Sequence, residues 1–129
     1  MDLYARPMPS PTEQRLRLLP ELHAVSLVDA VPEDDGWRAL VRAPEGLTVI
    51  RVVGPDAPGP HWRAIYGDTA HGLDVPGMLA AILVPLAGAG VPVFVASTYH
   101  ADLVLVPVEA VSRAVTALRR EGFSIDDGQ

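Results

Sequence analysis

The stretch that decides the fold is PGMLAAILVPLAGAGVPVFVASTYHADLVLVP, which occupies residues 76–107. In its first half, aliphatic residues recur at the i, i+3, i+4 and i+7 spacing of one apolar helix face: Leu79, Ile82, Leu83 and Leu86. Its second half holds two runs of strand-forming residues, 91–96 and 103–106, joined by six residues that are mostly polar. The stretch therefore predicts a helix over residues 76–87, then two strands with a polar loop at 97–102.

The ends of this predicted helix carry residues that are typical of helix boundaries. Asp74 is placed to cap the N-terminus, and Pro76 suits the first turn, where a missing N–H leaves no bond unmade. Pro85 removes a backbone donor and should bend the last turn. Gly88 or Gly90 can supply the left-handed residue that ends the helix.

On either side of this stretch the pattern continues as one domain. Residues 62–66 predict a strand before the helix. Residues 108–121 predict a second helix, and residues 123–125 a short last strand. The apolar face of the second helix is formed by Val108, Val111, Val115 and Leu118. The order β-α-β-β-α-β is the split βαβ, ferredoxin-like arrangement of an α+β protein.

The N-terminal half of the chain predicts strands without helices. Residues 23–28 are typical of a strand, and residues 38–43 and 47–53 flank the turn-forming 44–46 as a hairpin. The proline-rich segment 54–60 cannot be regular structure and is the best boundary in the chain.

We therefore expect a flexible arm at residues 1–12, an N-terminal unit at 13–60 and a C-terminal domain at 61–126. The pattern WRA plus an aliphatic residue occurs at Trp37 and again at Trp62. Because this pattern is only four residues long, it can reflect either an internal repeat or chance.

The composition excludes several classes of function. The chain of 129 residues is 49% hydrophobic and 20% charged, which is typical of a globular protein. A net charge of −6 and the absence of a basic cluster argue against a nucleic-acid partner. Without cysteine, disulfides and thiolate chemistry are excluded.

The location of the protein is also indicated by the sequence. The first residues contain no apolar secretory segment, so we expect a cytoplasmic protein. The run from Val75 to Tyr99 has no charged residue and is long enough to span a bilayer. Its prolines and glycines, and the absence of a basic anchor close by, favour a helix and a strand instead, so we expect no membrane partner.

Three kinds of site can be tested against the residues. Ser97, His100 and Asp102 are the residue types of a hydrolase triad, but a tight loop makes their side chains diverge and no nucleophile elbow is present. The four histidines lack the spacing of a known metal motif, so we expect neither a metal nor a cofactor. Residues 72–77 precede the predicted helix, where free N–H groups favour a small carboxylate, although an ordinary capped helix start is the alternative.

The sequence also resembles a known family. LDVPGMLAAIL at 73–83, followed by LAGAGVPV at 86–93, resembles the strand-to-helix turn and first helix of an ACT domain. VFVASTYHADLVLV at 93–106 is similar to the STxxTDxxLV signature of small tandem-ACT proteins related to CASTOR-type amino-acid sensors, with Ala101 in place of its Thr. LVRAPEGLTV at 40–49 resembles the ITRTxxELSI hairpin of the same family more weakly.

This resemblance implies two ACT-like units, the first degenerate, packed side by side. It further implies a small effector, commonly an amino acid, that lies between ACT units. The effector would contact the turn before the first helix and the loop between the second and third strands. By position, these ligand-binding residues are His71, Gly72, Leu73, Asp74, Gly77, Ser97, Thr98, Tyr99, His100 and Asp102.

Asp102 leaves two interpretations open. It can accept a hydrogen bond from a ligand ammonium or guanidinium, while the helix-start amides receive the ligand carboxylate. Alternatively, it accepts backbone hydrogen bonds and shapes its own loop.

We therefore expect a non-catalytic sensor of an amino acid or similar metabolite. The alternative is a ligand-free module for oligomerisation or protein interaction, and a small hydrolase is a third reading. An ACT unit alone leaves a sheet edge to cover, so we expect a homodimer.

Overall fold

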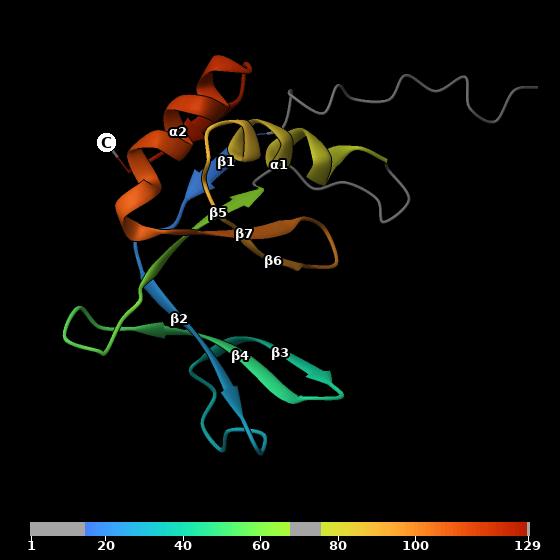
Figure 1. Ribbon diagram of the computed structural model, residues 1–129, viewed down its shortest axis with the longest axis vertical. Coiled ribbons are helices and arrows are strands. Elements are labelled where there is room, and N and C mark those ends of the chain that lie inside the picture. The colour runs from blue at the N-terminus through green and yellow to red at the C-terminus, as the bar shows by residue number, and fades with distance from the viewer. Residues whose placement is uncertain (1–14, 68–75, 129) are drawn as a thin grey trace, which may run out of the picture.

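The computed structural model describes residues 15–67 and 76–128 (Figure 1). Within these residues, eight strands form one branched sheet, which is accompanied by two α-helices and a short 3-10 helix. The elements are β1 (Arg15–Leu18), β2 (Leu22–Val28), β3 (Trp37–Ala43), β4 (Gly46–Val53), β5 (Trp62–Gly67), α1 (Met78–Gly88), β6 (Phe94–Ser97), β7 (Asp102–Pro107), η2 (Val108–Ala110), α2 (Val111–Arg120) and β8 (Ser124–Asp126).

The predicted β-α-β-β-α-β order is present from β5 to β8. Strand β5 lies at the centre, where it pairs antiparallel with β7, and β7 pairs antiparallel with β6. Figure 1 shows both helices in the upper part of the molecule, beside this portion of the sheet. The sheet-dominated α+β fold expected from the sequence is therefore observed.

Strand β1 was not predicted from the sequence, and it lies between β5 and β8. It pairs antiparallel with β5, where Leu16 stands opposite Gly67. It pairs parallel with β8, where Leu16 stands opposite Ile125. The segment that the sequence assigns to an N-terminal unit thus supplies a strand to the C-terminal part of the sheet.

The other N-terminal strands form an antiparallel meander in the order β2, β4, β3. The hairpin predicted around residues 44–46 is confirmed as β3 and β4. Their pairing runs from Ala43 opposite Gly46, next to the turn, to Trp37 opposite Arg51. The meander joins the rest of the sheet through one pair, His23 opposite Trp62. Figure 1 shows it below the helices, and none of the described helices covers it.

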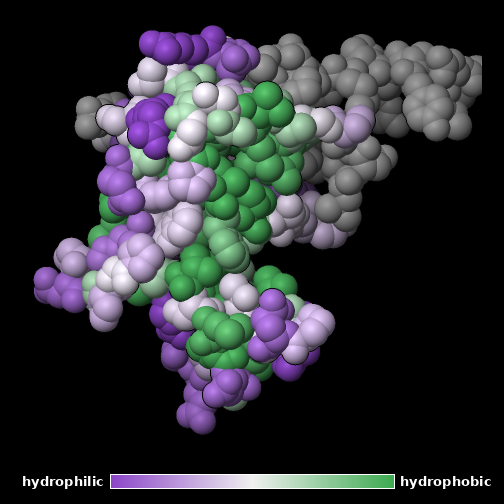
Figure 2. Space-filling model, viewed as in Figure 1, coloured by the Kyte–Doolittle hydropathy of each residue, from purple (hydrophilic) through white to green (hydrophobic). Residues whose placement is uncertain are grey.

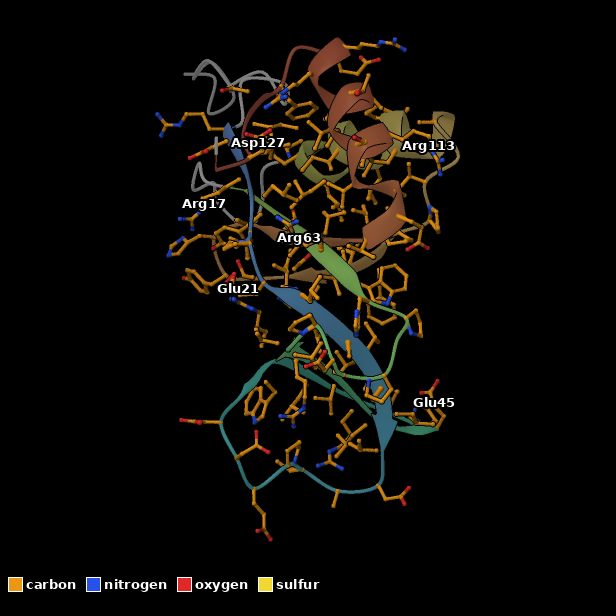
Figure 3. All side chains as sticks on the ribbon, turned by 90° about the vertical axis from the view of Figure 1, so that its left-hand side faces the viewer. Arg17, Glu21, Glu45, Arg63, Arg113 and Asp127 are labelled. Atoms are coloured by element: carbon orange, nitrogen blue, oxygen red, sulfur yellow. The ribbon has the colours of Figure 1, made fainter. Side chains whose placement is uncertain are left out.

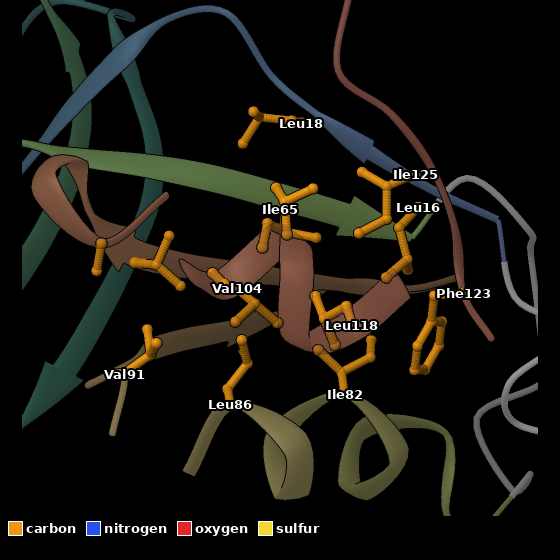
Figure 4. Packing of buried hydrophobic residues seen from close by; sticks show 14 residues of the cluster. Leu16, Leu18, Ile65, Ile82, Leu86, Val91, Val104, Leu118, Phe123 and Ile125 are labelled. Carbon is orange, nitrogen blue, oxygen red and sulfur yellow. The ribbon is translucent and has the colours of Figure 1, made fainter. Parts of the chain in front are cut away.

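The main core lies between the sheet and the helices (Figure 4). Helix α1 buries Met78, Ile82 and Leu86, whereas the predicted core residues Leu79 and Leu83 are only partly buried against the cluster. Its partners in this cluster include Leu16, Ile65 and Val104 of the sheet, Leu118 of α2, and Phe123, which lies between α2 and β8.

The second predicted helix begins later than expected. Val108 lies in η2 and is 39% exposed, so its assignment to the buried face was wrong. Helix α2 buries Val115 and Leu118, as predicted, together with Ala114. Val111 is only partly buried against the core cluster.

The ends of α1 correct one prediction and confirm another. The helix begins at Met78, and its N-cap is Gly77, with φ of 81° and no side-chain cap, so the assignment of that position to Asp74 was wrong. Asp74 itself lies outside the described residues. Gly90 has φ of 72° and Val91 N–H donates to the carbonyl of Leu86, as expected for a left-handed helix end. None of the described helices is long and apolar enough to cross a membrane.

A second, smaller cluster lies on the sheet face away from the helices. Its buried members are Leu19, Ile50, Ala64, Leu103 and Leu105. Ile50 belongs to the meander and the leucines of β7 to the central sheet, so this cluster holds the two parts of the sheet together.

Candidate functional site

The polar loop between β6 and β7 is held by its own hydrogen bonds. Ser97 Oγ donates to Asp102 Oδ1 at 2.8 Å. Thr98 N–H donates to the carbonyl of Ala101 at 2.8 Å, and Ala101 N–H donates to Thr98 Oγ1 at 3.0 Å. Asp102 is only 6% exposed, so a buried carboxylate anchors the loop where β7 begins. This favours the loop-shaping interpretation of Asp102, with the Ser97 hydroxyl as one donor.

The loop does not form a hydrolase triad. In a triad the histidine ring lies between the serine and the aspartate. Here Ser97 contacts Asp102 directly, whereas the His100 ring packs edge-on against Tyr99, with 4.8 Å between ring centroids. Tyr99 is 73% exposed, so both rings stand at the outer tip of the loop.

A cleft of about 550 Å³ lies beside this loop, between the central strands and the meander. Its lining comes from β1 and the chain that follows it, from β3, from the end of β5, from the loop and from the beginning of β7. Figure 3 shows Arg17 and Glu21 on the same side of the molecule, one below the other along the chain that leaves β1. The residues that line the cleft and carry its chemistry are Arg17, Glu21, Arg38, Tyr66, Thr98 and Leu103.

The cleft combines opposite charges. Arg38 Nη2 lies 2.8 Å from Glu21 Oε1, and both side chains are about one third exposed. The other carboxylate oxygen, Glu21 Oε2, is buried without a hydrogen-bond partner. Arg17 is exposed and has no ion-pair partner among the described residues. Arg17 and Glu21, which carry opposite charges, therefore both line the cleft.

His23 lies close to this ion pair and is fully buried. Neither ring nitrogen has a hydrogen-bond partner in the described part of the chain. Burial lowers the pKa of His23 below its ordinary value, and the Arg38 guanidinium lowers it further, although Glu21 opposes the effect. The ring is therefore held neutral where the meander meets β5.

The predicted site residues have different outcomes. Thr98 lines the cleft, and Ser97 and Asp102 form the bond at the base of the loop. Tyr99 and His100 lie at the loop tip, away from the cleft lining. Gly77 is the N-cap of α1. The remaining four, His71, Gly72, Leu73 and Asp74, lie outside the described residues.

Of the cleft residues with polar or charged side chains, the sequence reasoning missed four: Arg17, Glu21, Arg38 and Tyr66. Arg17 had a usable signal, since RLRL at 15–18 alternates charged and apolar residues as a half-buried strand does. Arg38 had none, because it reaches the cleft only after the meander folds back toward β1.

The described residues contain no group of three or more histidine, aspartate or glutamate side chains that could hold a metal ion. The charged and polar side chains that line the cleft can form hydrogen bonds and charge pairs with a small polar molecule.

Several solved structures share this fold. A protein from Agrobacterium tumefaciens superposes with a TM-score of 0.76 at 20% sequence identity, covering 91% of this chain and 95% of its own. A Vibrio cholerae protein of unknown function, described as a possible transport protein, gives 0.72 at 22% identity, covering 84% and 89%. The ligand-free regulatory subunit of aspartate kinase from Thermus thermophilus gives 0.57 at 12% identity, covering 87% and 98%. At these identities the likeness shows the fold alone.

Comparison with proteins of curated function gives no significant match. The sequence model of the ACT domain family, in contrast, matches residues 42–120, from the end of β3 to the end of α2. ACT domains are generally regulatory modules that bind small ligands. Because this match takes in more than half of the chain and the elements follow the ferredoxin-like order, the chain belongs to the ACT domain family.

Proposed function

We propose that this protein is a non-catalytic regulatory module that binds an amino acid or a similar small zwitterion. Membership of the ACT family supports a regulatory role, as does the similarity in fold to a regulatory subunit of aspartate kinase. The observation that carries the proposal is the cleft, where Arg17 and Glu21 offer opposite charges to one ligand.

The binding mode follows from the charges of the cleft. The ligand carboxylate pairs with the Arg17 guanidinium, and the ligand ammonium pairs with the Glu21 carboxylate. The ion pair with Arg38 holds that carboxylate in place. Tyr66 and Thr98 also line the cleft and add polar side chains to it. The turn at 71–74, predicted to contact the ligand, follows β5 shortly after Tyr66 and stays part of the proposal.

The proposed relation to tandem-ACT sensors assigns the meander to a degenerate first unit. The cleft then lies between the two units, since β3 supplies Arg38 and the C-terminal sheet supplies Tyr66 and Leu103. A ligand that bridges them favours one relative position of the two units. The change to this position is how ligand binding is signalled.

The alternative function is a ligand-free assembly module. Strand β6 pairs only with β7 among the described strands, so its outer edge is available to a second copy. Figure 2 shows apolar surface in the middle of the molecule, around α1 and β6, with hydrophilic residues at the margins. Val84 of α1 is 69% exposed, which agrees with a homodimer that covers this surface.

Calorimetric titration with each of the twenty amino acids tests the proposal. We expect at least one of them to bind, and we expect Arg17→Gln and Glu21→Gln each to weaken binding at least about tenfold, because each loses one charge pair. Arg42→Gln is the matched control, since Arg42 is exposed on β3 and does not line the cleft.

Two results separate the alternatives. If well-folded protein gives no heat with any amino acid, the sensor proposal is wrong. A dimer that forms without ligand, and that dissociates when Val84 is replaced by Glu, would then support the assembly module.

A further inference from the structure

A second groove, of about 340 Å³, lies on the helix side of the sheet. It runs between α2, the end of β1 and the C-terminal segment after β8. Ser112, Thr116 and Arg119 follow one another along α2 at i, i+4 and i+7, so they share one helix face that lines this groove. Arg63 of β5 and Asp127 line it from the other elements.

The geometry of Arg63 leaves its charge available. Its Nε donates to the carbonyl of Leu19 at 2.8 Å, which fixes the plane of the guanidinium. Neither of its terminal nitrogens has a hydrogen-bond partner, and Arg63 forms no ion pair within residues 15–67 and 76–128. A partly buried guanidinium that is oriented but unneutralised attracts an anion.

Arg119 is the second cation of the groove, and it is only loosely neutralised. Its Nη2 donates to the carbonyl of Ile125 at 2.8 Å and lies 3.4 Å from Asp127 Oδ2. A close charge-assisted bond is about 2.7–2.9 Å, so this ion pair is long. The charged residues that line the groove are two arginines, Arg63 and Arg119, and one aspartate, Asp127. Their formal charges sum to one positive charge.

From this arrangement we propose that the groove binds a phosphoryl group, either as free phosphate or as part of a small phosphorylated metabolite. The groove is lined by guanidinium side chains from two elements, β5 and α2, and by the hydroxyl-bearing side chains of Ser112 and Thr116. A tetrahedral oxyanion uses such donors better than a planar carboxylate does. The groove lies on the opposite side of the sheet from the cleft at Arg17, so the two sites are separate.

The test follows backbone amide resonances of the full chain by NMR during titration with inorganic phosphate, glycerol 3-phosphate and acetate at constant ionic strength. We expect saturable shifts at Arg63 and along residues 112–119 with both phosphoryl probes, and at least about fivefold weaker binding of acetate. Tighter binding of glycerol 3-phosphate than of phosphate identifies a metabolite as the ligand, and equal binding identifies free phosphate.

Variants locate the binding. Arg63→Gln should weaken phosphate binding at least about tenfold, whereas Asp127→Asn should strengthen it about threefold, because a competing charge is removed. Arg120→Gln is the matched control, since Arg120 is exposed on α2 but does not line the groove. If Arg63→Gln proves unstable, Thr116→Val serves in its place. It removes a hydroxyl group but no charge, and it should also weaken phosphate binding.

Two outcomes overturn the proposal. One is binding that fails to saturate, or that spreads over all the exposed arginines. The other is an affinity that falls as much in Arg120→Gln as in Arg63→Gln.

Discussion

At the scale of single residues, His23 is the group whose protonation matters most for stability. It is fully buried, and its pKa lies below the ordinary 6.5 because burial and Arg38 disfavour the charged ring. The unfolded chain therefore binds more protons than the folded protein once the pH falls below about 6.5. Acid then stabilises the unfolded state, so the free energy of unfolding must fall with pH in this window.

Above pH 6.5, we expect proton uptake by His23 to have no effect on the free energy of unfolding. Below pH 6.5, we expect this proton uptake to lower the free energy of unfolding. The contribution of this residue is at most about 1.4 kcal/mol per pH unit. Urea unfolding between about pH 8 and about pH 5 measures this slope. His23→Leu should lose the His23 part of the slope, because a leucine of similar size takes up no proton.

His61→Gln is the control for this experiment. His61 is not fully buried, and its replacement shows how far the loss of any one histidine changes the slope. A slope in His23→Leu as steep as that of the parent protein would contradict the expectation.

Single residues also show which parts of the site could be predicted from the sequence and which could not. The loop at 97–102 was identified because polar residues between two apolar runs are unusual, and Thr98 does line the cleft. Glu21 and Arg38 were not identified, because a charged residue beside a strand is most often solvated. Their contact spans 17 positions and exists only once β3 has folded beside the chain that leaves β1.

At the scale of elements, two glycine substitutions at the end of α1 should change the free energy of unfolding in opposite directions. Gly88 is the last helical residue, and Gly90 has φ of 72°, yet a Cβ at either position meets nothing within 4 Å. Gly90→Ala should lower the free energy of unfolding by about 1 kcal/mol, because a left-handed backbone disfavours a side chain. Gly88→Ala should raise it by about 0.5–1 kcal/mol, because alanine restricts the unfolded chain and favours the helix.

Thermal and urea unfolding of the two variants measure this difference, and each serves as the control for the other. If both substitutions change stability in the same direction, the helix does not end at the left-handed Gly90.

Elements with a long periodic pattern were predicted well from the sequence. Helix α1 and strands β4, β5 and β7 were placed within a few residues, since their apolar spacing is set by what they bury. Strand β1 was not predicted, because four residues give little pattern and its partners β5 and β8 are distant in the sequence. Short strands are specified by their tertiary neighbours more than by their own residues.

At the scale of the whole molecule, β1 and β8 connect the two ends of the described chain. The family match at 42–120 includes neither strand. Among the described strands, β8 pairs only with β1, so a C-terminal domain cut at residue 61 would leave β8 without its partner and β5 with one edge uncovered. The domain boundary predicted at residues 60 and 61 can be tested on this basis.

Leu16→Ala is the sharpest test of this dependence in the full chain. Leu16 is 1% exposed and packs in the main core with residues of both helices, so its truncation should cost about 2–5 kcal/mol. Leu27→Ala, in the same N-terminal segment but 62% exposed, should change stability by less than about 0.5 kcal/mol. Hydrogen exchange should show the loss in the amides of α1 and α2, because the core that holds them includes β1. Protection of both helices that is unchanged in Leu16→Ala would instead mean that residues 61–126 fold independently of β1.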